Sequence, residues 1–108
     1  MVGATVADGG VNPVTRERVV DAETCRCTLA VMTTVGLYET SGDRLYEIGL
    51  PGKSGIGGGI VAVAPDKGGL GTFAPPLGAA GNSVRGQLAA RFLSRELGLD
   101  LFVSEPAP

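Results

Sequence analysis

The stretch that decides the fold is Ile56-Gly57-Gly58-Gly59-Ile60-Val61-Ala62-Val63-Ala64, which turns at Pro65-Asp66-Lys67-Gly68-Gly69 and returns through Leu70-Gly71-Thr72-Phe73-Ala74. Short apolar runs bounded by Pro, Gly and Asp are typical of β-strands, and consecutive apolar side chains indicate a strand covered on both faces. A tight turn between two such runs predicts an antiparallel hairpin. Upstream, the alternation in Leu45–Ile48 predicts a third strand, with Glu39–Asp43 as the turn before it.

Two helices are predicted on either side of these strands. Asp21 and Ser83 are suitable N-caps, and Gly36 and Gly98 are suitable residues to end the helices that follow. Between these limits apolar side chains recur at helical spacing: Cys25, Leu29, Met32 and Val35 in the first helix, and Val84, Leu88, Phe92 and Leu97 in the second. The first 20 residues carry turn-forming Gly, Asn and Pro and are expected to form a loop, whereas residues 103–108 are expected to form a frayed tail.

The order helix, strand, strand, strand, helix predicts an α+β fold in which an antiparallel sheet is flanked by helices. Residues 1–108 are too few for more than a single segment of this kind. Three strands make a thin sheet, and strands that are apolar on both faces require cover on both sides and partners at their edges. We therefore expect a piece of a larger sheet, and we expect its unpaired edges to favour a homo-oligomer.

Composition excludes several classes of function. The 9 Lys and Arg residues against 11 Asp and Glu residues give a net charge of −2, so no basic surface is expected for nucleic acid or an anionic membrane. No apolar run is long enough for a membrane span, and the start of the chain lacks the pattern of a secretory leader, so we expect a cytoplasmic protein. With no histidine in the chain, Ser-His-Asp triads, Cys-His dyads and imidazole metal sites are excluded.

Cys25 and Cys27 are the only cysteines. On a helix two residues two positions apart point about 200° away from each other, so they neither chelate one metal ion nor form a disulfide comfortably. We expect free thiols in a reducing compartment.

The glycines before the central strand need an explanation. Glycine within a strand costs about 0.5–1 kcal/mol relative to alanine, so Gly57, Gly58 and Gly59 indicate a ligand or another backbone segment at close range. Gly52-Lys53-Ser54 is not a phosphate loop, because Glu47 stands where that motif needs its first glycine. The cluster Gly55–Gly59 also lacks the preceding strand and following helix of a dinucleotide site.

Lys53-Ser54-Gly55 at the start of an edge strand resembles the third signature motif of the serine β-lactamases and penicillin-binding proteins. Further motifs occur in a fixed order around it, within the ranges Gly9–Val19, Gly36–Gly42, Gly49–Ile60 and Ala74–Gly86. Together they resemble the C-terminal part of the serine-dependent glutaminases, a family with the β-lactamase-like fold, and the resemblance runs from about Ala4 to Phe102.

The resemblance implies hydrolysis of L-glutamine to L-glutamate and ammonia through an acyl-enzyme on a serine, without a metal ion or an organic cofactor. In the family, the nucleophile belongs to a Ser-x-x-Lys pair upstream, whose lysine activates the serine. This chain contains no Ser-x-x-Lys. We therefore expect a terminal fragment of a glutaminase that is inactive by itself.

The resemblance also assigns roles to residues of this chain. Tyr38 matches the tyrosine that lies beside the nucleophile and helps to move a proton to the leaving ammonia. Ile56 matches the residue whose backbone N–H forms half of the oxyanion hole. By analogy with β-lactamases, Lys53 and Ser54 are expected to border the substrate. A non-catalytic oligomerising or partner-binding module is the alternative from another functional class.

Overall fold

A computed structural model describes residues 1–37 and 41–104 of the chain. Its sheet has three antiparallel strands in the order β1 (Gly52–Ser54), β2 (Gly59–Ala64) and β3 (Gly68–Phe73). Ala62 in the central strand pairs with Gly52 on one side and with Leu70 on the other. The predicted hairpin is thus confirmed as β2 and β3. The third strand of the sheet is β1, which contains Lys53.

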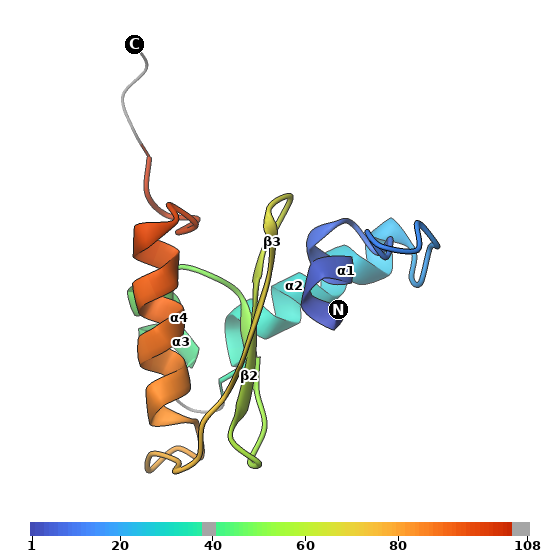
Figure 1. The fold of residues 1–108 in the computed structure, drawn as a ribbon. Coiled ribbons are helices and arrows are strands. Elements are labelled where there is room, and N and C mark those ends of the chain that lie inside the picture. The colour runs from blue at the N-terminus through green and yellow to red at the C-terminus, as the bar shows by residue number, and fades with distance from the viewer. Residues whose placement is uncertain (38–40, 105–108) are drawn as a thin grey trace.

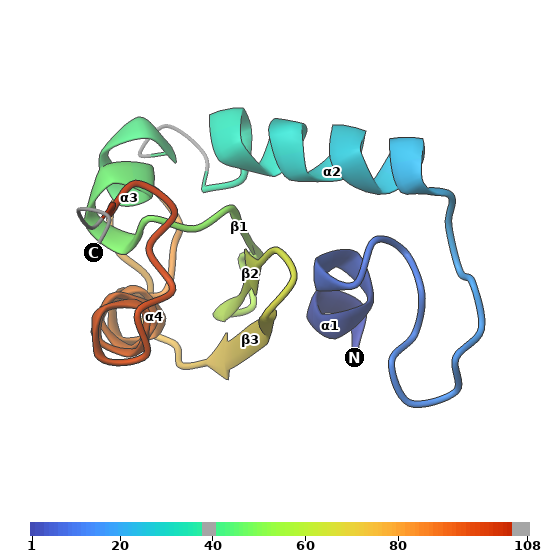
Figure 2. The same cartoon turned by 90° about the horizontal axis from the view of Figure 1, so that it is seen from above.

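Four helices surround this sheet: α1 (Val2–Ala7), α2 (Ala22–Val35), α3 (Ser41–Ile48) and α4 (Val84–Glu96). Figure 1 shows the sheet edge-on between α4 with α3 on one side and α1 on the other. Figure 2 shows α2 running past the β1 edge of the sheet and over α1. The predicted α+β class, an antiparallel sheet flanked by helices, is confirmed, with helices against both faces.

The two helices predicted from their caps are confirmed as α2 and α4. The Asp21 carboxylate accepts a 2.7 Å hydrogen bond from the backbone N–H of Thr24, and the Ser83 hydroxyl accepts one of 3.0 Å from Gly86. Hydrogen bonds from the Thr24 side chain and backbone N–H lower the pKa of the Asp21 carboxyl below its usual value. Both caps satisfy N–H groups that have no partner inside a helix.

The prediction of a strand at Leu45–Ile48 is wrong, because these residues form the second half of α3. Four residues are too few to distinguish a period of two from a helical period. In the helix Leu45 and Ile48 lie on one face, Tyr46 points to solvent, and Arg44 forms an ion pair with Glu47 one turn away. The turn predicted at Glu39–Asp43 is also wrong from Ser41 onward, and Glu39 lies outside the described residues.

The loop predicted for the first 20 residues is wrong at its start, where α1 occupies Val2–Ala7. A helix of this length is not stable alone and depends on packing. Gly3 packs against Gly69 of β3, where the helix and the strand meet without side chains between them. Residues 8–20 lie outside the helices and the named strands, as predicted, with one antiparallel bridge between Val11 and Arg18.

This contact predicts a large difference between two neighbouring glycines. A Cβ on Gly69 would lie 2.4 Å from the Gly3 carbonyl carbon, whereas a Cβ on Gly68 would meet no atom within 4 Å. Gly69→Ala is therefore expected to reduce the free energy of unfolding by about 1–3 kcal/mol through overpacking. Urea denaturation checks this, with Gly68→Ala as the control. Equal denaturation midpoints for the two variants would contradict the close contact between α1 and Gly69.

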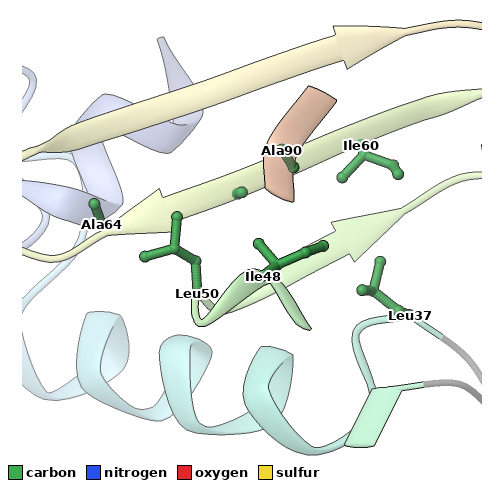
Figure 3. Packing of buried hydrophobic residues seen from close by; sticks show 7 residues of the cluster. Leu37, Ile48, Leu50, Ile60, Ala64 and Ala90 are labelled. Atoms are coloured by element: carbon green, nitrogen blue, oxygen red, sulfur yellow. The ribbon is translucent and has the colours of Figure 1, made fainter. Parts of the chain in front are cut away.

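The core lies between the sheet and helices α3 and α4, as Figure 3 shows. Its buried members are Leu37, Ile48, Leu50, Ile60, Ala62, Ala64 and Ala90. The apolar stripe predicted on α4 is not the face that packs on this core. Ala90 and Ser94 face inward, whereas Val84, Leu88 and Phe92 are exposed.

None of the described helices is long and apolar enough to cross a membrane.

Candidate active site

The backbone between β1 and β2 forms a tight turn around Ile56. The N–H of Gly55 donates to the Gly59 carbonyl at 3.0 Å, and the N–H of Gly58 donates to the Gly55 carbonyl at 3.1 Å. Within the part of the chain that the structure describes, the N–H of Ile56 has no hydrogen-bond acceptor. The Ile56 side chain is 78% exposed. The turn therefore presents an N–H that the sheet does not use.

The glycines that follow Ile56 differ in the space around them. Gly58 has φ +98°, and a Cβ there would lie 2.8 Å from the Pro75 nitrogen, so glycine is required at this position. The predicted close approach of another backbone segment is thus confirmed at Gly58. A Cβ on Gly57 would meet no atom within 4 Å.

Strand β1 directs Lys53 and Ser54 to opposite faces of the sheet, as its alternation requires. Lys53 is exposed and, with Val61 and Val63, lines an apolar cavity of about 540 Å³ between the sheet and helices α1 and α2. Ser54 is buried, and its hydroxyl donates to the side-chain oxygen of Asn82. Whether either residue borders a substrate stays a prediction.

Tyr38, the fourth predicted site residue, lies outside the described residues. The residues before it are fixed beside β1. The Gly36 carbonyl accepts the N–H of Ser54 at 3.0 Å, and the Leu37 carbonyl accepts the side-chain amide of Asn82 at 2.8 Å. The Leu37 N–H donates to the Ser41 hydroxyl at 2.9 Å. The segment that ends at Leu37 is thus bonded to the strand leading into the Ile56 turn.

A family model described as glutaminase matches residues 1–102, nearly the whole chain. The chain belongs to the glutaminase family. It is 76% identical over 106 residues to glutaminase 2 of Yersinia pestis, covering 98% of this chain and 31% of that protein. It is 52% identical over 101 residues to glutaminase 1 of Escherichia coli strain K12, covering 94% of this chain and 33% of that protein.

Solved glutaminase structures share the fold. A probable glutaminase superposes with a TM-score of 0.92 at 50% identity, over 95% of this chain and 33% of that one. The Bacillus subtilis glutaminase, solved as a covalent complex with 5-oxo-L-norleucine formed from 6-diazo-5-oxo-L-norleucine, gives a TM-score of 0.89 at 31% identity over 94% of this chain and 37% of that one. The architecture is thus part of the β-lactamase-like fold. The chain spans about a third of the length of the curated relatives it matches.

Four of the five serines of this glutaminase segment are buried and hydrogen-bonded. Ser41, Ser54, Ser83 and Ser94 are buried, and each takes part in a hydrogen bond to a protein group. None of the five serines in the sequence is followed three residues later by lysine. No group of three or more His, Cys, Asp or Glu residues within ranges 1–37 and 41–104 could hold a metal ion.

Asn82 was not singled out by sequence reasoning as a site residue. It lies within the motif range Ala74–Gly86, but the resemblance assigns it no role. The structure adds that Asn82 is 1% exposed and bonds at once to β1 and to the segment that precedes Tyr38. The sequence does not show that this side chain is buried with both ends bonded to distant segments, so its role is found from the three-dimensional contacts.

Proposed function

We propose that this chain supplies part of the active site of an amidohydrolase that converts L-glutamine to L-glutamate and ammonia through a serine acyl-enzyme. Membership of the glutaminase family supports this substrate and reaction. The observation that carries the proposal is the Ile56 N–H, which has no acceptor among the described residues and lies just beyond Lys53-Ser54-Gly55. A fixed N–H with free donor capacity is the kind of group that stabilises charge on a carbonyl oxygen.

The proposed reaction divides the work between two parts of a longer polypeptide. A serine of a Ser-x-x-Lys pair outside this sequence gives its proton to the lysine of that pair and attacks the side-chain amide carbon of glutamine, and the carbonyl oxygen becomes an oxyanion. The Ile56 N–H donates to that oxygen. Collapse of the tetrahedral intermediate breaks the C–N bond. The Tyr38 hydroxyl passes a proton to the departing NH2 group, which leaves as ammonia, and Tyr38 regains a proton from the lysine. Water then releases glutamate from the serine.

Lys53 is proposed to contribute its positive charge near the substrate, and Ser54 to lie at the border of the same site. The chain itself is proposed to correspond to the C-terminal part of the glutaminase domain. A cytoplasmic location is proposed for the protein.

A chimera tests the proposal directly. In Yersinia pestis glutaminase 2, the segment that matches this chain is replaced by this chain, and release of ammonia from L-glutamine is measured. We expect the chimera to hydrolyse glutamine and the isolated chain to release no ammonia above a Tyr38→Phe control. Ammonia release by the isolated chain at the rate of the chimera would overturn the division of work proposed above.

Gly57 gives a further prediction in the same chimera. Because a Cβ at Gly57 meets no atom of the described residues within 4 Å, Gly57→Ala is expected to leave the thermal unfolding temperature unchanged. A methyl group beside the oxyanion donor is expected to obstruct the substrate and lower kcat/KM by about tenfold or more. Gly42→Ala is the control, because a Cβ there also meets no atom within 4 Å among residues 1–37 and 41–104. Equal kcat/KM values for the Gly57→Ala and Gly42→Ala chimeras would show that the substrate does not come close to Gly57.

The alternative function, a non-catalytic oligomerising module, is favoured by one observation. Val84, Leu88 and Phe92 form an exposed apolar row along α4, each between 45% and 61% exposed. Faces of this kind are commonly covered by protein. Native mass spectrometry of the isolated chain tests self-association through this row: dimers that are lost in Phe92→Ser would support it, and a monomer would oppose it.

A further inference from the structure

We propose that Asn82 and Ser83, the two residues before α4, are positioning residues that fix the orientation of the Ile56 N–H from both ends of its turn. The inference rests on the proposed function, because it assigns the two residues to the oxyanion donor of that reaction. Neither residue contacts the Ile56 N–H itself. Both act through hydrogen bonds to neighbouring backbone.

Asn82 controls the entry to the turn. Its side chain is 1% exposed, its oxygen accepts from the Ser54 hydroxyl, and its amide donates to the Leu37 carbonyl at 2.8 Å. Ser54 lies two residues before Ile56 and is itself buried. With both ends of the amide occupied, Asn82 defines where the end of β1 lies relative to the segment ending at Leu37.

Ser83 controls the exit from the turn. Its hydroxyl donates to the Ala74 carbonyl, and the N–H of Ala74 in turn donates to the Gly58 carbonyl at 2.9 Å. Gly58 lies two residues after Ile56 and packs against Pro75. Ser83 is 0% exposed, and its oxygen also caps α4 by accepting the N–H of Gly86. Gly58 is therefore connected, through one intermediate residue, to the start of a 13-residue helix.

This arrangement accounts for two fully buried polar residues side by side. Burying such groups is costly unless each is hydrogen-bonded. The Asn82 side chain bonds to Ser54 and to Leu37, and the Ser83 hydroxyl bonds to Ala74, the residue whose N–H bonds to Gly58. An oxyanion donor stabilises charge only when its N–H points at the oxygen, and a misplacement of about 1 Å can cost about a hundredfold in rate. We infer that the start of α4 serves as the rigid support for the donor.

The test uses the chimera defined above and two serine-to-alanine variants, each of which removes one buried hydroxyl donor. Ser54→Ala removes a buried hydroxyl donor from the Asn82 network, and Ser94→Ala removes an equally buried hydroxyl that donates to the Ile48 carbonyl between α4 and α3. Both are expected to lower the unfolding temperature. Only Ser54→Ala is expected to lower kcat, by about tenfold or more, with KM little changed. Ser54→Thr, which keeps the hydroxyl, should restore most of kcat.

Asn82→Asp is the second variant. It removes the hydrogen bond to the Leu37 carbonyl while keeping the size of the side chain. The aspartate can still accept from Ser54 but has no N–H for the Leu37 carbonyl, so kcat is expected to fall as in Ser54→Ala although the side chain keeps its size. Equal kcat values in Asn82→Asp, Ser54→Ala and Ser94→Ala would overturn the inference.

Amide hydrogen exchange gives a readout that does not need activity. Exchange at Gly55 and Gly58, whose N–H groups bond within the turn, should accelerate in Asn82→Asp and Ser54→Ala but not in Ser94→Ala. Unchanged exchange in all three variants would overturn the inference even if the chimera is active. If the parent chimera is inactive while exchange responds as expected, the proposed function fails. The conclusion that Asn82 and Ser83 hold the Ile56 turn in place then remains valid.

Discussion

Replacing Ile56 by proline in the chimera is expected to lower kcat for glutamine hydrolysis by about 10²–10³-fold, because proline has no N–H to donate to the oxyanion. Ile56 lies in a turn outside the strands, and its N–H makes no hydrogen bond within the described part of the chain, so no ladder bond is lost. Steady-state kinetics with L-glutamine provide the measurement. KM is expected to change little, since the interaction strengthens in the transition state.

Two comparisons make this result specific to the N–H. Ile56→Ala keeps the N–H and removes an exposed side chain, so its kcat is expected to stay close to that of the parent. Semisynthetic replacement of Ile56 by its α-hydroxy acid removes the N–H but keeps the side chain, and should reproduce the loss seen with proline. Full activity of the α-hydroxy acid enzyme would exclude Ile56 as the oxyanion donor.

Tyr38→Phe in the chimera is the second large effect, with an expected loss of about 10²–10⁴-fold in kcat, the range typical of a general acid or base. The change removes only the hydroxyl oxygen that is proposed to pass the proton to ammonia. Ammonia release under substrate saturation measures it.

Tyr46→Phe is the matched control, because Tyr46 lies on α3 with its side chain 85% exposed. It should leave kcat unchanged. Parent-level activity in Tyr38→Phe, together with an unchanged Tyr46→Phe, would remove the phenol from the mechanism.

The parts of the fold that were predicted from the sequence are those fixed by local chemistry. Asp21 and Ser83 offer side-chain acceptors to the first turn of a helix, and Gly36 ends the first of these helices, so α2 and α4 follow from a few residues each. The β2–β3 hairpin follows from two apolar runs joined at Pro65-Asp66-Lys67. In each case the determining residues are neighbours in the chain.

The parts that were missed depend on distant contacts. Helix α1 is held by the meeting of Gly3 with Gly69, far apart in sequence, and α3 has a pattern too short to reveal its period. The apolar row predicted on α4 is exposed in the structure. The sequence pattern shows that apolar side chains share one face of a helix, but it does not show whether another segment covers that face.

For the candidate site, the sequence resemblance pointed to Ile56, Lys53 and Ser54 in one motif and to Tyr38 in another, because both motifs match positions to which the family assigns a role. It could not identify Asn82, whose importance lies in bonds to β1 and to the segment before Tyr38. Turn-forming Asn residues are common, and a buried one differs from an exposed one only through its three-dimensional partners.

Covalent labelling with 6-diazo-5-oxo-L-norleucine tests most directly the central claim that the nucleophile of the reaction lies outside this segment. Intact mass spectrometry and peptide mapping are applied to the chimera and to the isolated chain. The account predicts a single adduct on the chimera, on a serine outside the 108 residues of this segment, and none on the isolated chain. An adduct on any residue of this segment would contradict it.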